Sequence, residues 1–173
     1  LYTFRPGKIE EISVSPDGKS LLILCGGNIY LYSTISGQLI KATTGYNDYK
    51  GVLFADDSKQ IYTIKDGHLH VLSPNLDKVF NIKLNFTSIG SLHLLPNKKI
   101  LIIGHSAAET YDPITKSFTA KLLVTKGTKY SKMVYLPFQQ YVAFYGNDIP
   151  IDFYDISTGE KVGSIPGKRA DDA

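Results

Sequence analysis

Residues 12–21 of the chain read ISVSPDGKSL, and related segments follow at 52–61 (VLFADDSKQI), 92–100 (LHLLPNKKI) and 133–141 (MVYLPFQQY). Each segment places a turn between two short apolar runs. One residue of each turn marks the spacing, which is 40, 40 and 41 positions for Pro16, Asp56, Pro96 and Pro137. A period of this length indicates an array of one supersecondary unit.

A second pair of residues repeats with nearly the same period. A large apolar or aromatic residue is followed by a small or acidic one, with spacings of 40, 39 and 43, at Tyr32-Ser33, Leu72-Ser73, Tyr111-Asp112 and Tyr154-Asp155. Two different patterns that share one period make a chance repeat a poor explanation.

Each repeat contains four short strand patterns with turns between them. The dipeptides Asp17-Gly18 and Gly26-Gly27 supply residues that tolerate positive φ, as tight hairpins require. No segment keeps helical spacing for three turns, so a helical solenoid is excluded. The sequence predicts an all-β fold, a β-propeller of four-stranded antiparallel blades with about 40 residues in each blade.

The repeat also predicts how the chain is divided. Residues 1–7 contain a strand pattern, Leu1–Phe4, that reads as the last strand of a preceding blade, so we expect the chain to be part of a larger ring. Four blades and a polar tail follow at 8–45, 46–85, 86–124, 125–167 and 168–173. In a larger ring the open blade faces at each end would need an apolar partner surface.

Some of these residues resemble the blades of WD-repeat proteins. The resemblance is carried by the turn at 15–19 (SPDGK) and by 154–159 (YDISTG), with Tyr111-Asp112 and Tyr154-Asp155 in the place of the Trp-Asp dipeptide. It covers the chain from about Lys8 to Gly167. The chain departs from the family because it has no Trp and no Gly-His dipeptide before a first strand, so it resembles a divergent WD-like propeller. The resemblance to this family implies that the chain serves as a subunit of a larger assembly.

Composition excludes several classes of protein. The formal charge of +3 does not require a nucleic-acid partner, and the single cysteine, Cys25, excludes an internal disulfide. No apolar run is long enough to span a membrane. Phosphate-loop, HExxH and calcium-loop motifs are absent, so no catalytic residue, metal site or cofactor is predicted. His68 and His70 are expected to be a solvent-facing pair on a strand, and Cys25 a small buried apolar residue.

The loops that share one face of a propeller carry more basic than acidic residues. Such a face attracts phosphates or an acidic partner, although solvated lysines in loops are also common. Tyrosines in the same loops either contact a partner or pack on the neighbouring blade. The candidate partner-binding residues on this face are Arg5, Lys50, Lys126, Lys129, Lys132, Arg169, Tyr49 and Tyr130.

These observations lead to a hypothesis about function. We expect a non-enzymatic scaffold that binds other protein subunits in a larger multiprotein assembly, inside the cell, in the cytoplasm or nucleus. One alternative is a propeller that contacts RNA, a ribonucleoprotein or an acidic protein surface through its basic loop face. The other is a non-catalytic propeller segment of a larger enzyme. Fold alone does not decide between them.

Overall fold

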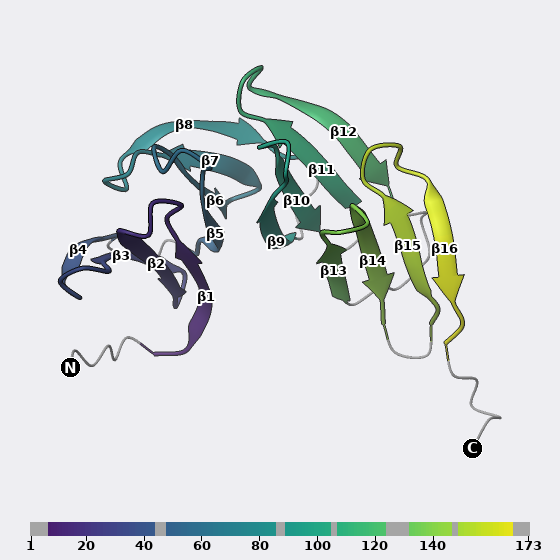
Figure 1. Cartoon of the computed structure of the whole chain (residues 1–173), viewed down its shortest axis with the longest axis horizontal. Coiled ribbons are helices and arrows are strands. Elements are labelled where there is room, and N and C mark those ends of the chain that lie inside the picture. The colour runs from purple at the N-terminus through teal and green to yellow at the C-terminus, as the bar shows by residue number, and fades with distance from the viewer. Residues whose placement is uncertain are drawn as a thin grey trace. The chain divides into compact units, whose positions relative to one another are not determined.

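The computed structural model describes residues 7–43, 48–85, 89–104, 107–123, 132–146 and 149–167. Within them, sixteen strands form four antiparallel sheets of four strands each, and each sheet follows chain order (Figure 1). The predicted all-β fold of four-stranded antiparallel blades is therefore confirmed. The chain divides into two compact units, Leu1–Thr87 (unit 1) and Ser88–Ala173 (unit 2).

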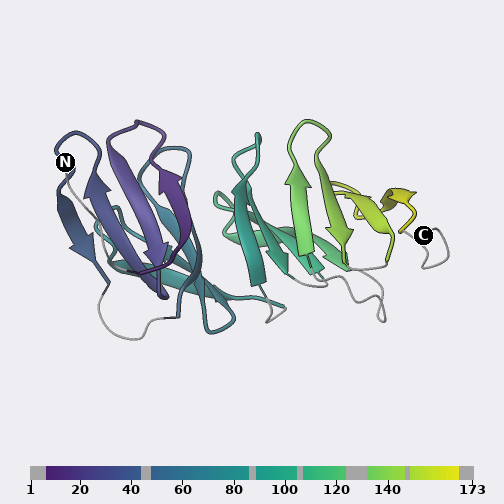
Figure 2. The ribbon, with the colours of Figure 1, turned by 90° about the horizontal axis from the view of Figure 1, so that it is seen from below.

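Unit 1 contains the first two sheets, which we call blade 1 and blade 2. Figure 2 shows their strands side by side. The predicted strand at Leu1–Phe4 lies outside the described residues. The strands of blade 1 are β1 (Ile9–Val14), β2 (Ser20–Cys25), β3 (Asn28–Ser33) and β4 (Leu39–Ala42), and those of blade 2 are β5 (Lys50–Phe54), β6 (Ile61–Lys65), β7 (His68–Leu72) and β8 (Lys78–Lys83).

Unit 2 contains blade 3 and blade 4, built in the same way. Among the described residues there is no helix long and apolar enough to cross a membrane. The strands of blade 3 are β9 (Ile89–Leu94), β10 (Ile100–Gly104), β11 (Ala107–Asp112) and β12 (Ser117–Leu123), and those of blade 4 are β13 (Lys132–Leu136), β14 (Tyr141–Tyr145), β15 (Ile151–Asp155) and β16 (Lys161–Ile165).

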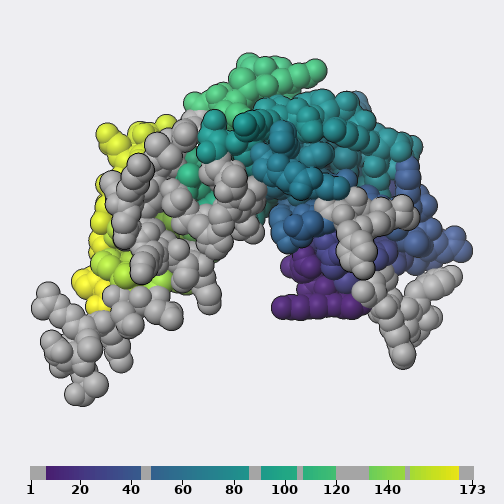
Figure 3. Space-filling model, turned by 180° about the vertical axis from the view of Figure 1, so that it is seen from behind, coloured from purple at the N-terminus to yellow at the C-terminus, as the bar shows by residue number. Residues whose placement is uncertain are grey.

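The core of unit 1 lies between its two blades. Alternate residues of a strand face the same side of the sheet, so Leu22 and Leu24 of β2 both point toward blade 2. There they pack with Phe54 and Ile61, and all four side chains are at most 3% exposed. Figure 3 shows unit 1, in purple to teal, as closely packed side chains. Cys25 is buried, as expected.

Unit 2 has an equivalent core between blade 3 and blade 4. Leu101 and Ile103 of β10 pack with Val142 and Phe144 of β14. The rings of Phe144 and Tyr154 meet edge to face, with centroids 5.5 Å apart, a favoured arrangement of aromatic pairs.

The first strands of neighbouring blades also touch in each unit. In unit 1, Glu11 Oε2 accepts a hydrogen bond from Val52 N at 3.0 Å, and Ser13 Oγ accepts one from Phe54 N at 3.2 Å. Burial raises the pKa of Glu11 despite its bond to the backbone. In unit 2 the contact is aromatic, since the ring centroids of His93 and Tyr135 lie 5.4 Å apart.

A β-bulge occurs at the same place in all four blades. The third strand pairs regularly with the fourth as far as the first residue of the second repeated pair. At that residue the fourth strand contains one extra residue. The bulge therefore occurs at the four residues that begin the second repeated pair, Tyr32, Leu72, Tyr111 and Tyr154. The extra residues are all exposed, and they are Ile40, Val79, Thr119 and Val162.

The small or acidic residue after each bulge stabilises the turn between the third and fourth strands. In blade 3, Asp112 Oδ1 accepts hydrogen bonds from Ile114 N (2.9 Å) and Thr115 N (3.3 Å). In blade 4, Asp155 Oδ1 accepts them from Ser157 N (2.7 Å) and Thr158 N (3.0 Å). Ser33 and Ser73 do the same with their hydroxyl oxygens. The second repeated pair therefore records a bulge followed by a turn cap.

The turns between first and second strands are aligned by a residue with positive φ. This residue is Gly18, Ser58, Lys98 or Gln140, with φ between 56° and 70°. Two positions before this residue lie Pro16, Asp56 and Pro96 in the first three blades and Phe138 in blade 4. Phe138, and not Pro137, is therefore the equivalent residue. The sequence alignment of Pro137 with these residues is thus wrong by one position, because the turn of blade 4, at 137–140, is shorter than the others.

The turn caps predict how stability depends on pH. The Ser15 hydroxyl lowers the pKa of Asp17, the backbone N–H of Ile114 lowers that of Asp112, and the Ser157 hydroxyl lowers that of Asp155. A carboxylate with a depressed pKa in the folded state stabilises the protein above its unfolded-state pKa of about 3.9. We expect the thermal midpoint to fall as the pH drops below about 4, toward the lowered folded-state pKa values.

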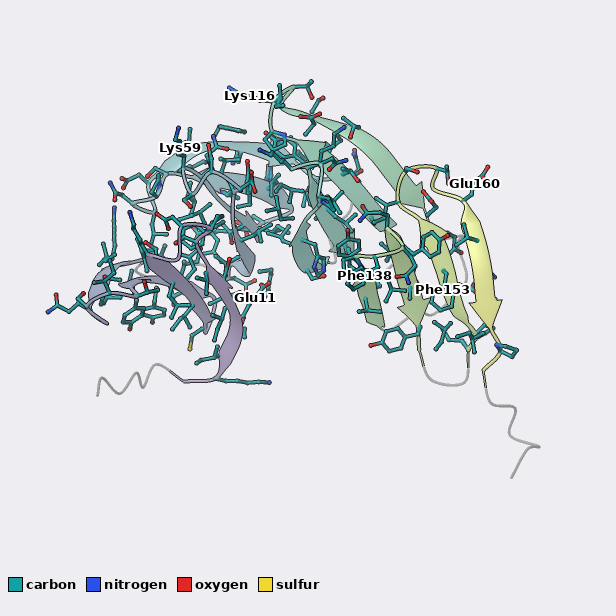
Figure 4. All side chains as sticks on the ribbon, in the orientation of Figure 1. Glu11, Lys59, Lys116, Phe138, Phe153 and Glu160 are labelled. Atoms are coloured by element: carbon teal, nitrogen blue, oxygen red, sulfur yellow. The ribbon has the colours of Figure 1, made fainter. Side chains whose placement is uncertain are left out.

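Thermal melts of variants at several pH values would check this result. The double variant Asp112→Asn/Asp155→Asn keeps a turn-capping oxygen and removes the titration, so its midpoint should depend less on pH. Glu160→Gln is the matched control, because Glu160 is an exposed acid in the turn that Asp155 caps (Figure 4). Its backbone N–H donates to Thr158 Oγ1, but no described hydrogen bond involves its carboxylate. An unchanged pH dependence in the double variant would contradict the assignment.

Candidate partner-binding surfaces

The structure describes only part of the predicted basic loop face. Tyr49 and Lys50 are described in full, and Lys132 begins β13. The remaining predicted residues, Arg5, Lys126, Lys129, Tyr130 and Arg169, lie outside the described residues. The two that are described in full lie next to each other in blade 2.

Lys50 has an acidic partner within its own loop. Its Nζ lies 2.6 Å from Asp48 Oδ1, and both side chains are more than half exposed. Hydrogen bonding to Asp48 raises the pKa of Lys50. An exposed pair of this kind contributes little to stability, but it balances the charge of this lysine locally. The described part of the loop therefore has no net charge at this pair.

Tyr49 packs against the core of unit 1 and forms part of an aromatic cluster. Its ring centroid lies 6.3 Å from that of His70, edge to face, and Lys65 Nζ lies 5.3 Å from the tyrosine ring centroid. Burial is the largest cause of the raised pKa of Tyr49 and of the lowered pKa of His70. Both side chains are therefore uncharged at neutral pH. Tyr49 therefore packs on the blades, and its contact with a partner stays a prediction.

The prediction of a solvent-facing histidine pair is wrong for His70. Its side chain is only 9% exposed, because it faces the interior of unit 1 beside Tyr49. His68 is partly exposed, and its Nδ1 lies 2.7 Å from the carbonyl oxygen of Asp66. The described residues contain no group of three His, Cys, Asp or Glu side chains placed to hold a metal ion.

Three large apolar residues are exposed in turns at the opposite ends of the sheets. Ile35 and Ile114 follow the turn caps of blade 1 and blade 3 at the same position, and are 80% and 90% exposed. Blade 2 and blade 4 have Asn75 and Ser157 there. Phe138, in the first turn of blade 4, is 96% exposed (Figure 4). We call Ile35, Ile114 and Phe138 the apolar turn residues.

A groove of about 480 Å³ in unit 2 is lined in part by Gln139 and Gln140, which follow Phe138 in the same turn. It runs between blade 3 and blade 4, at the ends where their turns lie. Leu95 and Ile156, both nearly buried, supply apolar surface. The other lining residues are polar or charged, and they are Asn97, Lys99, Thr110, Thr119, Gln139, Gln140, Asp155 and Ser157.

Comparison with known proteins adds evidence on the fold. No family model matches the chain, and no curated protein matches it. Among solved structures it is similar to a hydrazine synthase of Kuenenia stuttgartiensis, with 16% sequence identity and a TM-score of 0.74. The similarity covers 95% of this chain and 50% of that one, so the chain spans about half the length of the protein that it matches. At this identity the likeness shows the β-propeller fold alone.

Neither the apolar turn residues nor the groove was among the sequence candidates. A signal for the first was present, since Ile35, Ile114 and Phe138 interrupt turns that otherwise hold Pro, Asp, Asn or Ser. The groove has no signal of its own, because its lining comes from five separate segments of two blades.

Proposed function

We propose that this chain is a non-enzymatic interaction scaffold of the propeller class, and a subunit of a larger protein assembly. The observation that carries this proposal is the exposure of the apolar turn residues. Turn positions favour polar residues, and nearly full exposure of Ile35, Ile114 and Phe138 gives no packing benefit within either unit. Large apolar side chains displayed on rigid turns are typical anchors for protein partners.

The turns themselves are held by local hydrogen bonds, which suits this role. The caps at Ser33 and Asp112 fix the turns that carry Ile35 and Ile114. Gln140 Nε2 donates to the carbonyl oxygen of Pro137 at 2.6 Å, across the turn that carries Phe138. A surface ordered before binding loses less conformational entropy when a partner docks.

The divergent WD-like assignment belongs to the same proposal. The pairs Tyr111-Asp112 and Tyr154-Asp155 support it by their position at the end of the third strand, where each aspartate caps the next turn. We do not extend the proposal to RNA, since Lys50, the candidate lysine whose side chain is described, is paired with Asp48.

The test is capture of partners by the tagged protein from its own cells, with crosslinking and mass spectrometry. Wild-type protein should retain specific protein partners at high salt, because apolar contacts are not screened. The triple variant Ile35→Ser/Ile114→Ser/Phe138→Ser should lose them and keep the wild-type thermal midpoint. A wild-type protein that is isolated alone, or partners retained by the triple variant, would contradict the proposal.

The likeness to a hydrazine synthase favours one alternative. The chain is similar to half of an enzyme chain, so it could serve as a non-catalytic propeller segment of a larger enzyme. Peptide mass mapping of the protein isolated from its cell distinguishes the two, because only the alternative requires a catalytic domain in the same polypeptide.

A further inference from the structure

The groove of unit 2 is chemically different from a site for a charged ligand. Lys99 Nζ lies 3.3 Å from Asp112 Oδ2, so its charge is balanced. Asp155 already accepts hydrogen bonds from the Ser157 hydroxyl and from two backbone N–H groups of its own turn. The rest of the lining is made of neutral amides and hydroxyls. Asn97 Oδ1 accepts a hydrogen bond from Lys99 N at 3.2 Å, whereas no described hydrogen bond involves Asn97 Nδ2 or the exposed amide group of Gln139.

Apolar residues occur both in the groove and in the turn that supplies part of its lining. Leu95 and Ile156 lie in the groove, and Phe138 is the neighbour in sequence of the lining residue Gln139. The turn does not need this phenylalanine, because the corresponding positions of the other blades hold Pro16, Asp56 and Pro96. A residue that departs from the local turn chemistry without a packing role indicates a function.

We propose that this groove binds an extended, uncharged peptide segment of a partner protein, with one apolar side chain of the segment packed against Phe138. This proposal rests on the scaffold function, and it specifies the surface that the scaffold uses and the chemistry of the partner segment. Main-chain N–H and C=O groups are neutral donors and acceptors that match the amides of Asn97 and Gln139. An apolar side chain of the segment fits Phe138 and Ile156, because packing there removes apolar surface from water.

The geometry supports this assignment in two ways. A volume of about 480 Å³ is within the usual range for binding pockets, large enough for a short stretch of chain. The side-chain hydrogen bond from Gln140 to Pro137 holds the tip formed by Phe138 and Gln139, so the aromatic anchor and the amide are presented together.

A phage-displayed library of random linear peptides, selected against the whole chain, tests the proposal. Selected peptides should share an apolar residue, and isothermal titration calorimetry should show about tenfold weaker binding to Phe138→Ser and to Gln139→Glu. Val79→Ser is the control, since Val79 is an exposed apolar residue of β8 in unit 1, and its binding should equal that of wild type. Matching thermal midpoints show that all variants are folded.

The outcomes separate this proposal from the scaffold function. Peptides whose binding ignores both groove variants, or maltotriose bound in their place, would overturn the groove assignment. Cellular partners retained by Phe138→Ser and Gln139→Glu would do the same and leave the scaffold function standing. A wild-type protein without cellular partners, but with groove-dependent peptide binding, would instead support the groove and count against the scaffold.

Discussion

Phe144→Ala lowers the free energy of unfolding by about 3–5 kcal/mol, the largest effect that we expect from a single substitution in this chain. Phe144 is fully buried on β14, between blade 3 and blade 4. Truncation removes apolar burial, the edge-to-face contact with Tyr154, and the packing of Val142 and Ile103 around the ring. The cavity that remains cannot collapse easily, because its walls are hydrogen-bonded sheets.

Phe138→Ala provides the matched control within the same blade. Its side chain is 96% exposed, so the same chemical change should alter stability by no more than about 0.5 kcal/mol. Urea unfolding of both variants, compared at equal slope, measures the difference. Equal loss of stability in the two variants would contradict the packing of unit 2 described above.

Gly27→Ala is expected to lower the free energy of unfolding by about 2–4 kcal/mol. Gly27 has a φ of 68°, and a Cβ built there would lie 2.8 Å from Asp48 Cα and 3.0 Å from Asp48 N. Both are backbone atoms, so relief requires movement of the chain. Since the carbonyl oxygen of Gly27 accepts a hydrogen bond from Tyr49 N, that movement would also disturb the loop that holds Tyr49 and Lys50.

Gly26→Ala separates steric contact from backbone strain. Gly26 also has a positive φ, 56°, but a Cβ at this position meets nothing within 4 Å. We therefore expect a loss of only about 1 kcal/mol, from the left-handed backbone alone. Thermal or urea unfolding of the two variants measures the two losses of stability. Equal losses would contradict the close approach of Gly27 to the backbone of Asp48.

Much of the fold could be predicted from the sequence because its signals are local. Alternation and turn residues act within a few positions, so the four strand patterns predicted for each repeat correspond to the four observed strands of each blade. The repeat of Tyr or Leu before Ser or Asp was visible, but its cause was not. A bulge depends on pairing between two strands, which the spacing alone does not reveal.

The functional surface was predicted less well because it depends on packing between blades. His70 looked like its neighbour His68 on a strand, yet the contact with Tyr49 from another loop buries it. The charge of the loops suggested Lys50 as a partner-binding residue. In the folded chain the turn brings the carboxylate of Asp48, two residues earlier, against the amino group of Lys50. The one-residue error at Pro137 hid Phe138 in an ordinary turn position. A short turn changes alignment without changing composition.

The repeated bulges have a consequence for how the protein behaves at high concentration. The fourth strand lies at the edge of each sheet, and an unprotected edge can template the growth of fibrils and amorphous aggregates. An extra residue at Ile40, Val79, Thr119 and Val162 breaks the regular ladder and increases the local twist. A foreign strand could then align with only a short run of each edge. The bulge in each blade thus protects that blade against self-association. Three of the four extra residues are apolar, so the protection lies where an exposed edge would otherwise be most adhesive.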